Sequence, residues 1–385
     1  YIHSHREEGR TSPMLGCCPN GTVDVDWGDG TAHDTLTGTS VTSAKWTPTH
    51  SYAAPGNYVI KLTVTGSMGL YGSSSTNYYC GLLRYASSSD TRNRHYINAI
   101  RRVEIGSNVT SINGYAFYFC SSLTSLTIPS NVTSIDTYAF NSCYSLTSLT
   151  IPSGVTSIGN YAFQYCYSLT SLTIPTGVTS IGSSVFASCY SLTSVTIPSG
   201  VTSIGSNTFR YCYSLTSATI PSNVTSIGSY AFANCYSLTS LTIPSGVTSI
   251  GTYAFSTCYS LTSLTIPSNV TSIGSSMFIS CYSLISLTIP SGVTSIGSSA
   301  FANCYSLTSL TIPSDVTSID SSVFSGCIGF AALHFQPTTP PTVVSSNAFA
   351  SIPTDCIIYV PTGSLTDYTT ATNYPSSSTY TYVEE

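Results

Sequence analysis

Side chains that can act as acids, bases or activated nucleophiles are rare in most of this chain of 385 residues. Between Tyr96 and Leu333 there is no His and no Lys. The acids of the same stretch are Glu104, Asp136, Asp315 and Asp320. A catalytic serine needs a base and an oxyanion site, and glycoside hydrolysis needs two facing carboxylates. The stretch supplies neither combination, so we expect no catalysis there.

An enzymatic site would have to lie in residues 1–99, where His33, His50 and His95 occur together with several acids. We therefore rank an enzyme third, after two binding functions. No CxxC pair and no His-containing metal-ligand spacing occurs in the chain. The sequence accordingly predicts no metal site and no cofactor.

One cluster of acids could still bind a cation. Asp24, Asp26 and Asp29 fall within VDVDWGDGT, and clustered carboxylates suit a hard ion such as Ca²⁺. We prefer the simpler interpretation, in which these three side chains cap turns and point out of a strand.

The element that organises the rest of the chain is a repeat of 23 residues, marked by a cysteine in every copy. The series is Cys120, Cys143, Cys166, Cys189, Cys212, Cys235, Cys258, Cys281, Cys304 and Cys327. A constant period of this length is typical of a solenoid. In one copy, Leu146, Leu149 and Ile151 have the LxxLxL spacing of a leucine-rich repeat strand, which ends at Pro152 because proline has no N–H for a sheet ladder. A second short strand of the type VTSI follows.

Two positions in each repeat hold only Gly, Asn or Asp, the residues that reach positive φ most easily. Gly154 exemplifies the first position and Gly159 the second. We predict a left-handed corner at both. Asn-Val-Thr sequons at the first position are explained by this backbone geometry without glycans. They begin at Asn108, Asn131, Asn223 and Asn269.

The stretch after the second corner, such as residues 160–166, is too short for a free helix, so we expect one helical or 3₁₀ turn. A Phe recurs in it, at Phe117, Phe140, Phe163, Phe186, Phe209, Phe232, Phe255, Phe278, Phe301 and Phe324, then at Phe349 after a two-residue insertion near Pro340 and Pro341. We predict that Phe and Cys stack into a core on this side of each coil. The ladder cysteines then act as buried, reduced hydrophobes. Whether Cys17, Cys18, Cys80 or Cys356 form a disulfide stays open.

The unit LTSLTIPSGVTSIGxxAFxxCYS resembles the leucine-rich repeats of BspA-like surface proteins, also called the Treponema pallidum type. The resemblance covers about residues 97–361, and CIIYVPTGSLTDY at 356–368 is similar to the C-terminal end of that family. It implies a repeat solenoid with a parallel β-sheet and short helical or 3₁₀ turns, in about 11 coils of 23 residues. It also implies a secreted or cell-surface protein of a host-associated bacterium that binds host or microbial surface and matrix proteins.

The N-terminal part carries a second resemblance. WGDGT at 27–31 and HSYAAPGNY at 50–58 resemble the opening and closing motifs of a PKD domain, a small immunoglobulin-like β-sandwich. Asp29-Gly30 predicts a hairpin, and the alternation from Tyr58 to Val64 predicts a half-buried strand. The expected organisation is a tail or remnant at 1–20, a PKD-like sandwich at 21–66, a connector and N-terminal cap at 67–96, the leucine-rich repeat solenoid at 97–361, and a C-terminal cap or tail at 362–385.

Composition narrows the classes of partner. Only 6% of the residues are charged and the formal net charge is −5, so the surface is expected to be rich in hydroxyl groups and weakly charged. There is no basic stripe for nucleic acid. No apolar run approaches the roughly 20 residues of a membrane span. The start, YIHSHREEGR, does not resemble a signal peptide.

Outward positions of the main strand, such as Ser148 and Thr150, should form ladders of hydroxyl groups from coil to coil. Just before them runs a ladder of tyrosines, whose flat rings and polar tips suit protein contacts or sugar stacking. Stacking of these rings on one another, purely for stability, is the competing interpretation. The candidate ligand-binding residues are Tyr144, Tyr167, Tyr190, Tyr213, Tyr236, Tyr259, Tyr282 and Tyr305. Arg210, Ala218 and Ile285 interrupt the otherwise uniform pattern.

The leading hypothesis is a non-catalytic extracellular adhesion or protein-interaction protein. The second is a carbohydrate-binding accessory protein that uses the tyrosine ladder.

Overall fold

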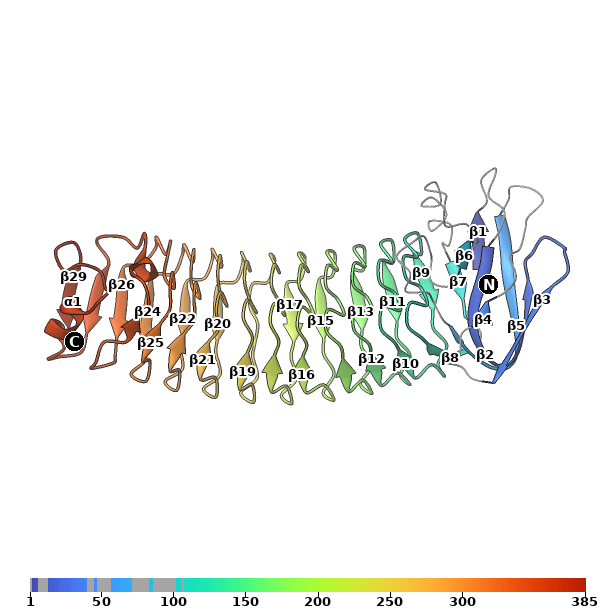
Figure 1. Cartoon of the computed structure of the whole chain (residues 1–385), viewed down its shortest axis with the longest axis horizontal. Coiled ribbons are helices and arrows are strands. Elements are labelled where there is room, and N and C mark those ends of the chain that lie inside the picture. The colour runs from blue at the N-terminus through green and yellow to red at the C-terminus, as the bar shows by residue number, and fades with distance from the viewer. Residues whose placement is uncertain are drawn as a thin grey trace. The chain divides into compact units, whose positions relative to one another are not determined.

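The computed structural model describes the backbone of residues 2–5, 13–39, 45–46, 57–70, 83–85, 102–105, 107 and 109–385, and the side chains of 21–38, 105, 107 and 109–385. The chain divides into two compact units, Tyr1–Gly200 and Val201–Glu385. In Figure 1 the first unit runs from blue to green and the second from yellow-green to red. Each unit is described by itself.

The first unit consists of strands joined by turns. Its N-terminal strands are β1 (Ile2–His5), β2 (Pro13–Asp26), β3 (Asp34–Thr39), β4 (Lys45–Trp46), β5 (Asn57–Leu70) and β6 (Leu83–Tyr85). Its coil strands are β7 (Arg102–Glu104), β8 (Val109–Ile112), β9 (Ser125–Thr127), β10 (Ser134–Ile135), β11 (Ser148–Thr150), β12 (Ser157–Ile158), β13 (Ser171–Thr173), β14 (Ser180–Ile181) and β15 (Ser194–Thr196).

The N-terminal strands continue the sheets of the coils. β2 pairs antiparallel with β3 and with β5, so the predicted Asp29-Gly30 hairpin is present. β5 in turn pairs parallel with β8, and β1 pairs antiparallel with both β5 and β7. These pairings cover the sheet edges of the first coil, as a terminal coil requires. The assignment of this region as PKD-like stays a prediction, and most of the expected connector at 67–96 lies outside the described residues.

The second unit repeats the coil pattern and ends in the two helices among the described residues. Its strands are β16 (Ser203–Ile204), β17 (Ser217–Thr219), β18 (Ser226–Ile227), β19 (Ser249–Ile250), β20 (Ser263–Thr265), β21 (Ser272–Ile273), β22 (Ser286–Thr288), β23 (Ser295–Ile296), β24 (Ser309–Ile312), β25 (Ser318–Ile319), β26 (Ala332–Phe335), β27 (Thr342–Val343), β28 (Ile357–Val360) and β29 (Thr381–Glu384). The helices are the 3₁₀ helix η3 (Ser346–Phe349) and α1 (Leu365–Thr370).

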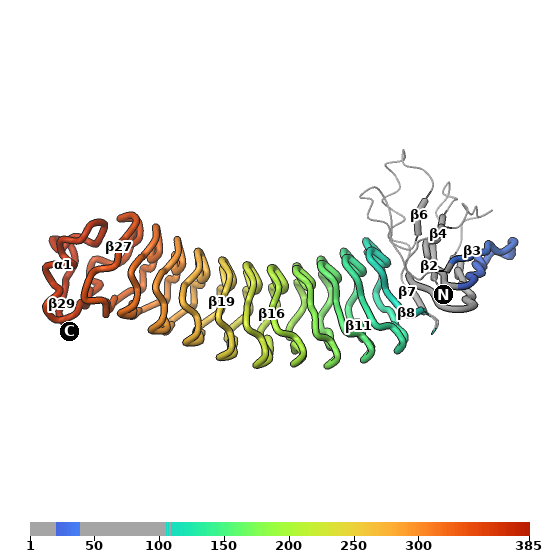
Figure 2. The backbone as a smooth tube through the Cα atoms, turned by 60° about the horizontal axis from the view of Figure 1, so that its bottom comes forward, coloured from blue at the N-terminus to red at the C-terminus, as the bar shows by residue number. Residues whose placement is uncertain are grey.

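Successive coils stack in parallel register, as Figure 2 shows for the backbone of each unit. Leu149 of β11 lies opposite Leu172 of β13. The outward-facing residues on either side of Leu149 also lie opposite their equivalents in the next coil. The VTSI strands pair in the same way, for example Ile158 with Ile181. The leucine-rich repeat solenoid predicted from the 23-residue period is therefore confirmed.

The core of the coils contains the predicted Phe and Cys series. Each Phe ring of the ladder from Phe117 to Phe324 is fully buried. Neighbouring rings stack, with centroids 4.9 Å apart for Phe117 and Phe140 in the first unit, and 5.7 Å apart for Phe255 and Phe278 in the second. Nine of the ten ladder cysteines are reduced and buried, as predicted. Cys120 departs from the prediction because it is disulfide-bonded.

The predicted left-handed corners are wrong in position. Gly154 and Gly159 are not among the residues with positive φ. In several coils glycine is favoured at the second position because successive coils approach closely there. A Cβ on Gly159 would lie 2.5 Å from the backbone N of Thr137, and one on Gly251 would lie 2.4 Å from the backbone N of Ser229. Close approach of two backbones selects glycine as strongly as a positive φ does.

The left-handed residues lie instead at both ends of the turn that carries the Phe, for example Tyr161 (φ 59°) and Tyr165 (φ 62°). Backbone N–H groups alternate in this turn. Ala162 donates back to Gly159, whereas Phe163 donates to Val185 of the next coil at 2.9 Å. Because every second donor reaches the next coil, this segment forms linked turns rather than a helix. The expected 3₁₀ turn occurs in η3, which contains Phe349.

The asparagines of two sequons bridge coils through their side chains. Asn269 Nδ2 donates to the carbonyl oxygen of Ser245 at 3.0 Å, and Asn131 Nδ2 donates to the carbonyl oxygen of Ser107. Cohesion between coils, rather than a left-handed backbone, therefore accounts for asparagine at the first position.

The second unit ends in a cap. β24, β26, β28 and β29 form a parallel sheet, and α1 packs Tyr368 into the core. The Tyr368 hydroxyl donates to the carbonyl oxygen of Pro337 at 2.6 Å, and the Tyr374 hydroxyl donates to that of Pro341 at 2.9 Å. Burial raises the pKa of both phenols. These bonds fix the proline loop of the longer last coil.

Candidate binding surface

The outer face of the main strands carries hydroxyl groups. In β11, Ser148 and Thr150 are exposed on either side of the buried Leu149. The same pattern occurs in β20 and β22 of the second unit, where Thr265 lies opposite Thr288. The face is therefore polar, and its chemistry repeats from coil to coil.

A threonine next to each of several main strands is held in a fixed orientation. Thr147 Oγ1 donates to the carbonyl oxygen of Thr124 at 3.3 Å, and Thr170 Oγ1 donates to that of Thr147 at 3.2 Å. In the second unit, Thr262 donates to Thr239 at 3.3 Å. The O–H of each of these threonines donates a hydrogen bond to the backbone, so only the lone pairs of the hydroxyl oxygen face solvent. A ligand would meet them as acceptors.

The eight predicted tyrosines form one stacked row in each unit. The first unit holds Tyr144, Tyr167 and Tyr190, with neighbouring centroids 4.8 and 4.5 Å apart. In the second unit the centroid distances are 4.6 to 4.7 Å and the interplanar angles 2 to 15°. The row there comprises Tyr213, Tyr236, Tyr259, Tyr282 and Tyr305.

Stacking determines what these rings can offer. Each inner ring has both faces covered by its neighbours, so it presents an edge and a hydroxyl group to solvent rather than a face. Burial, the neighbouring phenols and a hydrogen bond with Tyr190 raise the pKa of Tyr167 to about 12. Tyr167 thus presents a neutral phenol at physiological pH. At its C-terminal end Tyr305 is followed by Ile328, which is 59% exposed.

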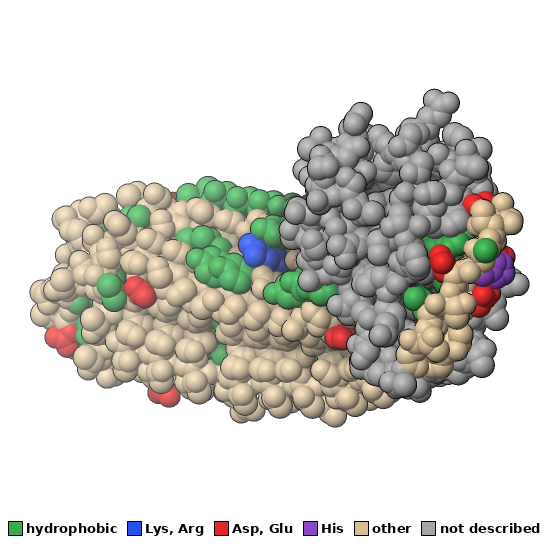
Figure 3. Space-filling model, turned by 45° about the vertical axis from the view of Figure 1, so that its right-hand side comes forward, with side chains coloured by type: hydrophobic (Ala, Val, Ile, Leu, Met, Phe, Trp, Pro, Cys, Tyr) green, Lys and Arg blue, Asp and Glu red, His purple; other side chains and the backbone are tan. Residues whose placement is uncertain are grey.

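The structure contains a second aromatic row that the sequence reasoning missed. Tyr115, Tyr138 and Tyr161 stack in the first unit at 4.9 and 4.7 Å, and Tyr230 and Tyr253 stack in the second at 4.6 Å. Their signal was the same 23-residue spacing, interrupted by Ser and Asn in other coils. Figure 3 shows hydrophobic side chains, in green, gathered on the surface beside the blue of Lys and Arg.

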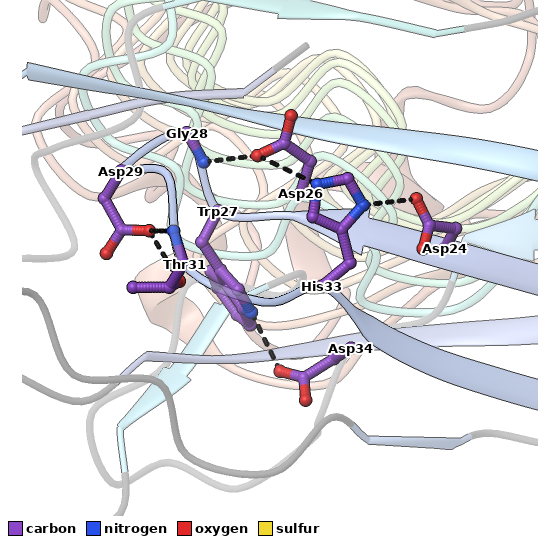
Figure 4. Close-up of polar contacts among 8 residues, drawn as sticks. All are labelled: Asp24, Asp26, Trp27, Gly28, Asp29, Thr31, His33 and Asp34. Atoms are coloured by element: carbon purple, nitrogen blue, oxygen red, sulfur yellow. Dashed lines mark hydrogen bonds and ion pairs between the residues drawn. The ribbon is translucent and has the colours of Figure 1, made fainter.

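The acids of the first unit cap turns and form an ion pair (Figure 4). Asp26 Oδ1 accepts from the Gly28 N–H at 2.8 Å, and Asp29 Oδ1 accepts from the Thr31 N–H at 3.1 Å. Asp24 Oδ2 lies 2.8 Å from His33 Nδ1. The turn-capping interpretation of Asp26 and Asp29 is therefore confirmed, while Asp24 pairs with a histidine across the hairpin.

Trp27 anchors this hairpin to the unit. Its ring is buried, and its Nε1 donates to Asp34 Oδ2 at 2.8 Å. In the described part of the chain, no group of three His, Cys, Asp or Glu is arranged to hold a metal ion.

The buried thiols of the ladder and of Cys356 are poor nucleophiles. Burial raises the pKa of Cys166 and of Cys281 to about 12, and that of Cys356 to about 11. A thiol attacks only as the thiolate, so these groups are inert near neutral pH.

Within the described residues, no helix has both the length and the apolar character needed to cross a membrane.

Comparison with known proteins agrees with this geometry. The model of the BspA type leucine rich repeat region matches residues 95–216 and 202–331 in six copies. No curated protein matches the chain. A leucine rich cell surface protein of Faecalibacterium prausnitzii A2-165 is 32% identical, with a TM-score of 0.50 over 74% of this chain and 88% of that one.

Two further solved structures share the fold. A leucine-rich repeat protein of Bacteroides ovatus is 24% identical, with a TM-score of 0.55 over 83% of this chain and 96% of that chain. The pneumococcal vaccine antigen PcpA is 22% identical, with a TM-score of 0.57 over 84% and 86%. The family match covers more than half of the chain and follows the repeats whose strands, Phe core and tyrosine rows are described above. The chain belongs to the BspA-type leucine-rich repeat family.

Proposed function

We propose that this protein is a non-catalytic, secreted or cell-surface adhesion protein that binds a protein ligand along the outer face of its main strands and the tyrosine rows. The observation that carries the proposal is the repeated surface itself, in which stacked tyrosine edges adjoin strands that expose Ser and Thr hydroxyls. The similarity to a cell surface protein supports the location.

The chemistry of this surface favours a protein ligand. Tyrosine combines a large apolar edge with one hydroxyl and is enriched where proteins meet. The fixed threonine hydroxyls can accept from the backbone N–H groups of a partner. A sugar ring would need an open aromatic face, and the inner rings of the rows have both faces covered. Matrix or cell-surface proteins of a host or of other microbes are the partners we expect.

The test is binding of the full chain to an array that carries extracellular-matrix proteins and glycans. A variant with Tyr213, Tyr236, Tyr259, Tyr282 and Tyr305 changed to Phe removes the hydroxyls and keeps the stack. A matched control changes Tyr115, Tyr138 and Tyr161, in the second aromatic row of the first unit, to Phe. We expect the wild type and the control to bind a matrix protein, and the five-site variant to bind it at least about tenfold more weakly.

Other results would overturn the proposal in different ways. Binding to glycans alone would replace it with the carbohydrate-binding function. Matrix-protein binding that the five-site variant retains would move the ligand away from the tyrosine row. If the chain binds neither the proteins nor the glycans of the array, the coils act as a spacer.

A further inference from the structure

Arg210 lies in the second unit between two aromatic rings. Its guanidinium carbon is 4.7 Å from the ring centroid of Tyr211, the next residue, and 4.6 Å from that of Tyr230, in the next coil. Both distances are within the range of favourable cation–π contact. Asn207 occupies the position where other coils place a tyrosine of the second row, so the guanidinium covers a face of Tyr230.

The hydrogen bonds of this guanidinium are few. Nη1 donates to Asn207 Oδ1 at 3.3 Å, and Nη2 donates to the Tyr211 hydroxyl at 2.9 Å. Nε is buried and has no hydrogen-bond partner. An arginine has five N–H donors, so most of them are unused.

The charge of Arg210 is also unbalanced. Ion pairs among the described residues involve His33 and His334, and none reaches Arg210. It is the only Lys or Arg whose side chain the structure describes. A half-buried cation without a counter-ion attracts an anionic group of a ligand.

The fold does not require an arginine at this place. The equivalent positions of the following coils are occupied by uncharged residues, and those coils stack in the same way. These residues are Ala233, Ser256, Ile279, Ala302 and Ser325. Arg210 is therefore a local feature of one coil.

We propose that Arg210, held by Tyr211, Tyr230 and Asn207, is a subsite that binds the carboxylate of an acidic segment in a protein partner. The inference rests on the proposed function and adds a charged anchor to it. The subsite adjoins the tyrosine row of that function, because Tyr211 contacts Tyr213 edge-to-face at 6.1 Å.

The geometry suits a carboxylate. The two rings fix the plane of the guanidinium, so little side-chain entropy is lost when its N–H fork meets two oxygens. Both faces of the Tyr230 ring are covered. Arg210 covers one face of Tyr230, and Tyr253 covers the other at 4.6 Å. An acidic peptide needs only the fork, whereas an acidic sugar would gain little from rings without an open face.

The test uses the full chain and a fluorescein-labelled oligoglutamate peptide, with oligoglutamine as the neutral probe, followed by fluorescence anisotropy at low and physiological salt. We expect oligoglutamate to bind weakly and oligoglutamine not to bind. Arg210→Gln should weaken the binding of oligoglutamate about fivefold or more, and added salt should weaken it further in the wild type. Thermal unfolding of each variant checks that the coil remains folded.

A charge-swap variant provides the matched control. Arg210→Ser combined with Ser256→Arg keeps the net charge and moves the cation two coils on, where Thr257 and Ser276 replace the two rings. We expect this variant to bind oligoglutamate as poorly as Arg210→Gln does.

Four results would overturn the inference. One is unchanged binding in Arg210→Gln, and another is full binding in the charge-swap variant, which would show attraction by charge alone. The third is competition by an oligogalacturonate that binds more tightly than the peptide, which would assign the subsite to acidic glycans. If the array detects a matrix protein whose binding Arg210→Gln leaves intact, this inference fails while the proposed function stands. If the array is silent, the oligoglutamate titration still decides the role of Arg210.

Discussion

The Cys258 thiol donates a hydrogen bond to the carbonyl oxygen of Phe232, 26 residues earlier, at 3.2 Å. The same bond joins Cys143 to Phe117 and Cys166 to Phe140 in the first unit, and Cys281 to Phe255 in the second. Cysteine therefore has two roles in these coils, as a small buried hydrophobe and as a donor to the coil before it. Serine would be more polar than this site requires, and alanine would fill less of it.

Substitutions at Cys258 separate these two roles. Cys258→Ala removes the donor and leaves a cavity, so we expect the free energy of unfolding to fall by about 2 kcal/mol. Cys258→Val removes the donor but fills the space, and should lower it by about 1 kcal/mol. Urea unfolding of the full chain measures both. A valine variant as stable as the wild type would show that the thiol bond contributes nothing.

Alkaline pH should destabilise the protein through its buried thiols. Burial raises the pKa of Cys166 and Cys281 to about 12, whereas a cysteine in the unfolded chain ionises near about 8.5. The unfolded state therefore loses protons first as the pH rises. The stabilising contribution is complete below about pH 8.5 and is lost as the pH approaches 12. Tm measured by circular dichroism should fall steadily above about pH 9, and a constant Tm up to about pH 11 would contradict this reasoning.

Two glycines of the second unit should respond differently to alanine. A Cβ on Gly251 would lie 2.4 Å from the backbone N of Ser229, so Gly251→Ala must push two coils apart and should cost about 3 kcal/mol. A Cβ on Gly292 would come no closer than 3.9 Å to Ser268, so Gly292→Ala should change stability by less than about 0.5 kcal/mol. Thermal unfolding compares them. Equal effects would mean that close approach is not what selects glycine at the second position.

The tyrosine row should contribute to stability through its rings rather than its hydroxyls. Tyr259 stacks on Tyr236 at 4.6 Å and on Tyr282 at 4.7 Å. Tyr259→Ala removes both contacts and should cost about 1–3 kcal/mol, while Tyr259→Phe keeps them and should cost less than about 0.5 kcal/mol. Differential scanning calorimetry checks the pair. A phenylalanine variant as unstable as the alanine variant would assign the stability to the hydroxyls.

Much of the coil was predictable because its physics is periodic. The spacing of Leu146, Leu149 and Ile151 predicted which residues face the core, and the recurrence of Phe163 and Cys166 predicted what fills it. Parallel register follows from identical repeats, since residues one period apart must lie opposite each other. These features needed no knowledge of distances between coils.

The backbone geometry of the corners was not predictable in the same way. Positive φ and close approach both favour glycine, so composition alone could not tell which of them applies at Gly159. The residues that do have positive φ are of several types, among them Tyr161, Tyr165 and Ser184, so residue type alone gave no signal. Their strain is offset by hydrogen bonds to the next coil, which a single repeat does not reveal.

The site was predicted in part. The eight tyrosines were identified as a ladder, and their stacked geometry was one of the two interpretations. The aromatic surroundings of Arg210 were not predicted. They depend on Asn207, which stands where other coils have a tyrosine, and on Tyr230 of the following coil. One of the two rings around the guanidinium, that of Tyr230, belongs to the next coil, so a single repeat does not reveal the contact.

The hydrogen bonds between threonines of neighbouring coils have an evolutionary consequence. Thr248 donates to the carbonyl oxygen of Thr225, and Thr317 donates to that of Thr294, so donor and acceptor are the same residue type one period apart. If a whole coil is duplicated or deleted, the new junction re-forms the same bonds. Unequal recombination between nearly identical coils can therefore change their copy number without requiring a new interface. The length of the stack of coils then becomes a heritable variable, while the cross-section of each coil stays constant.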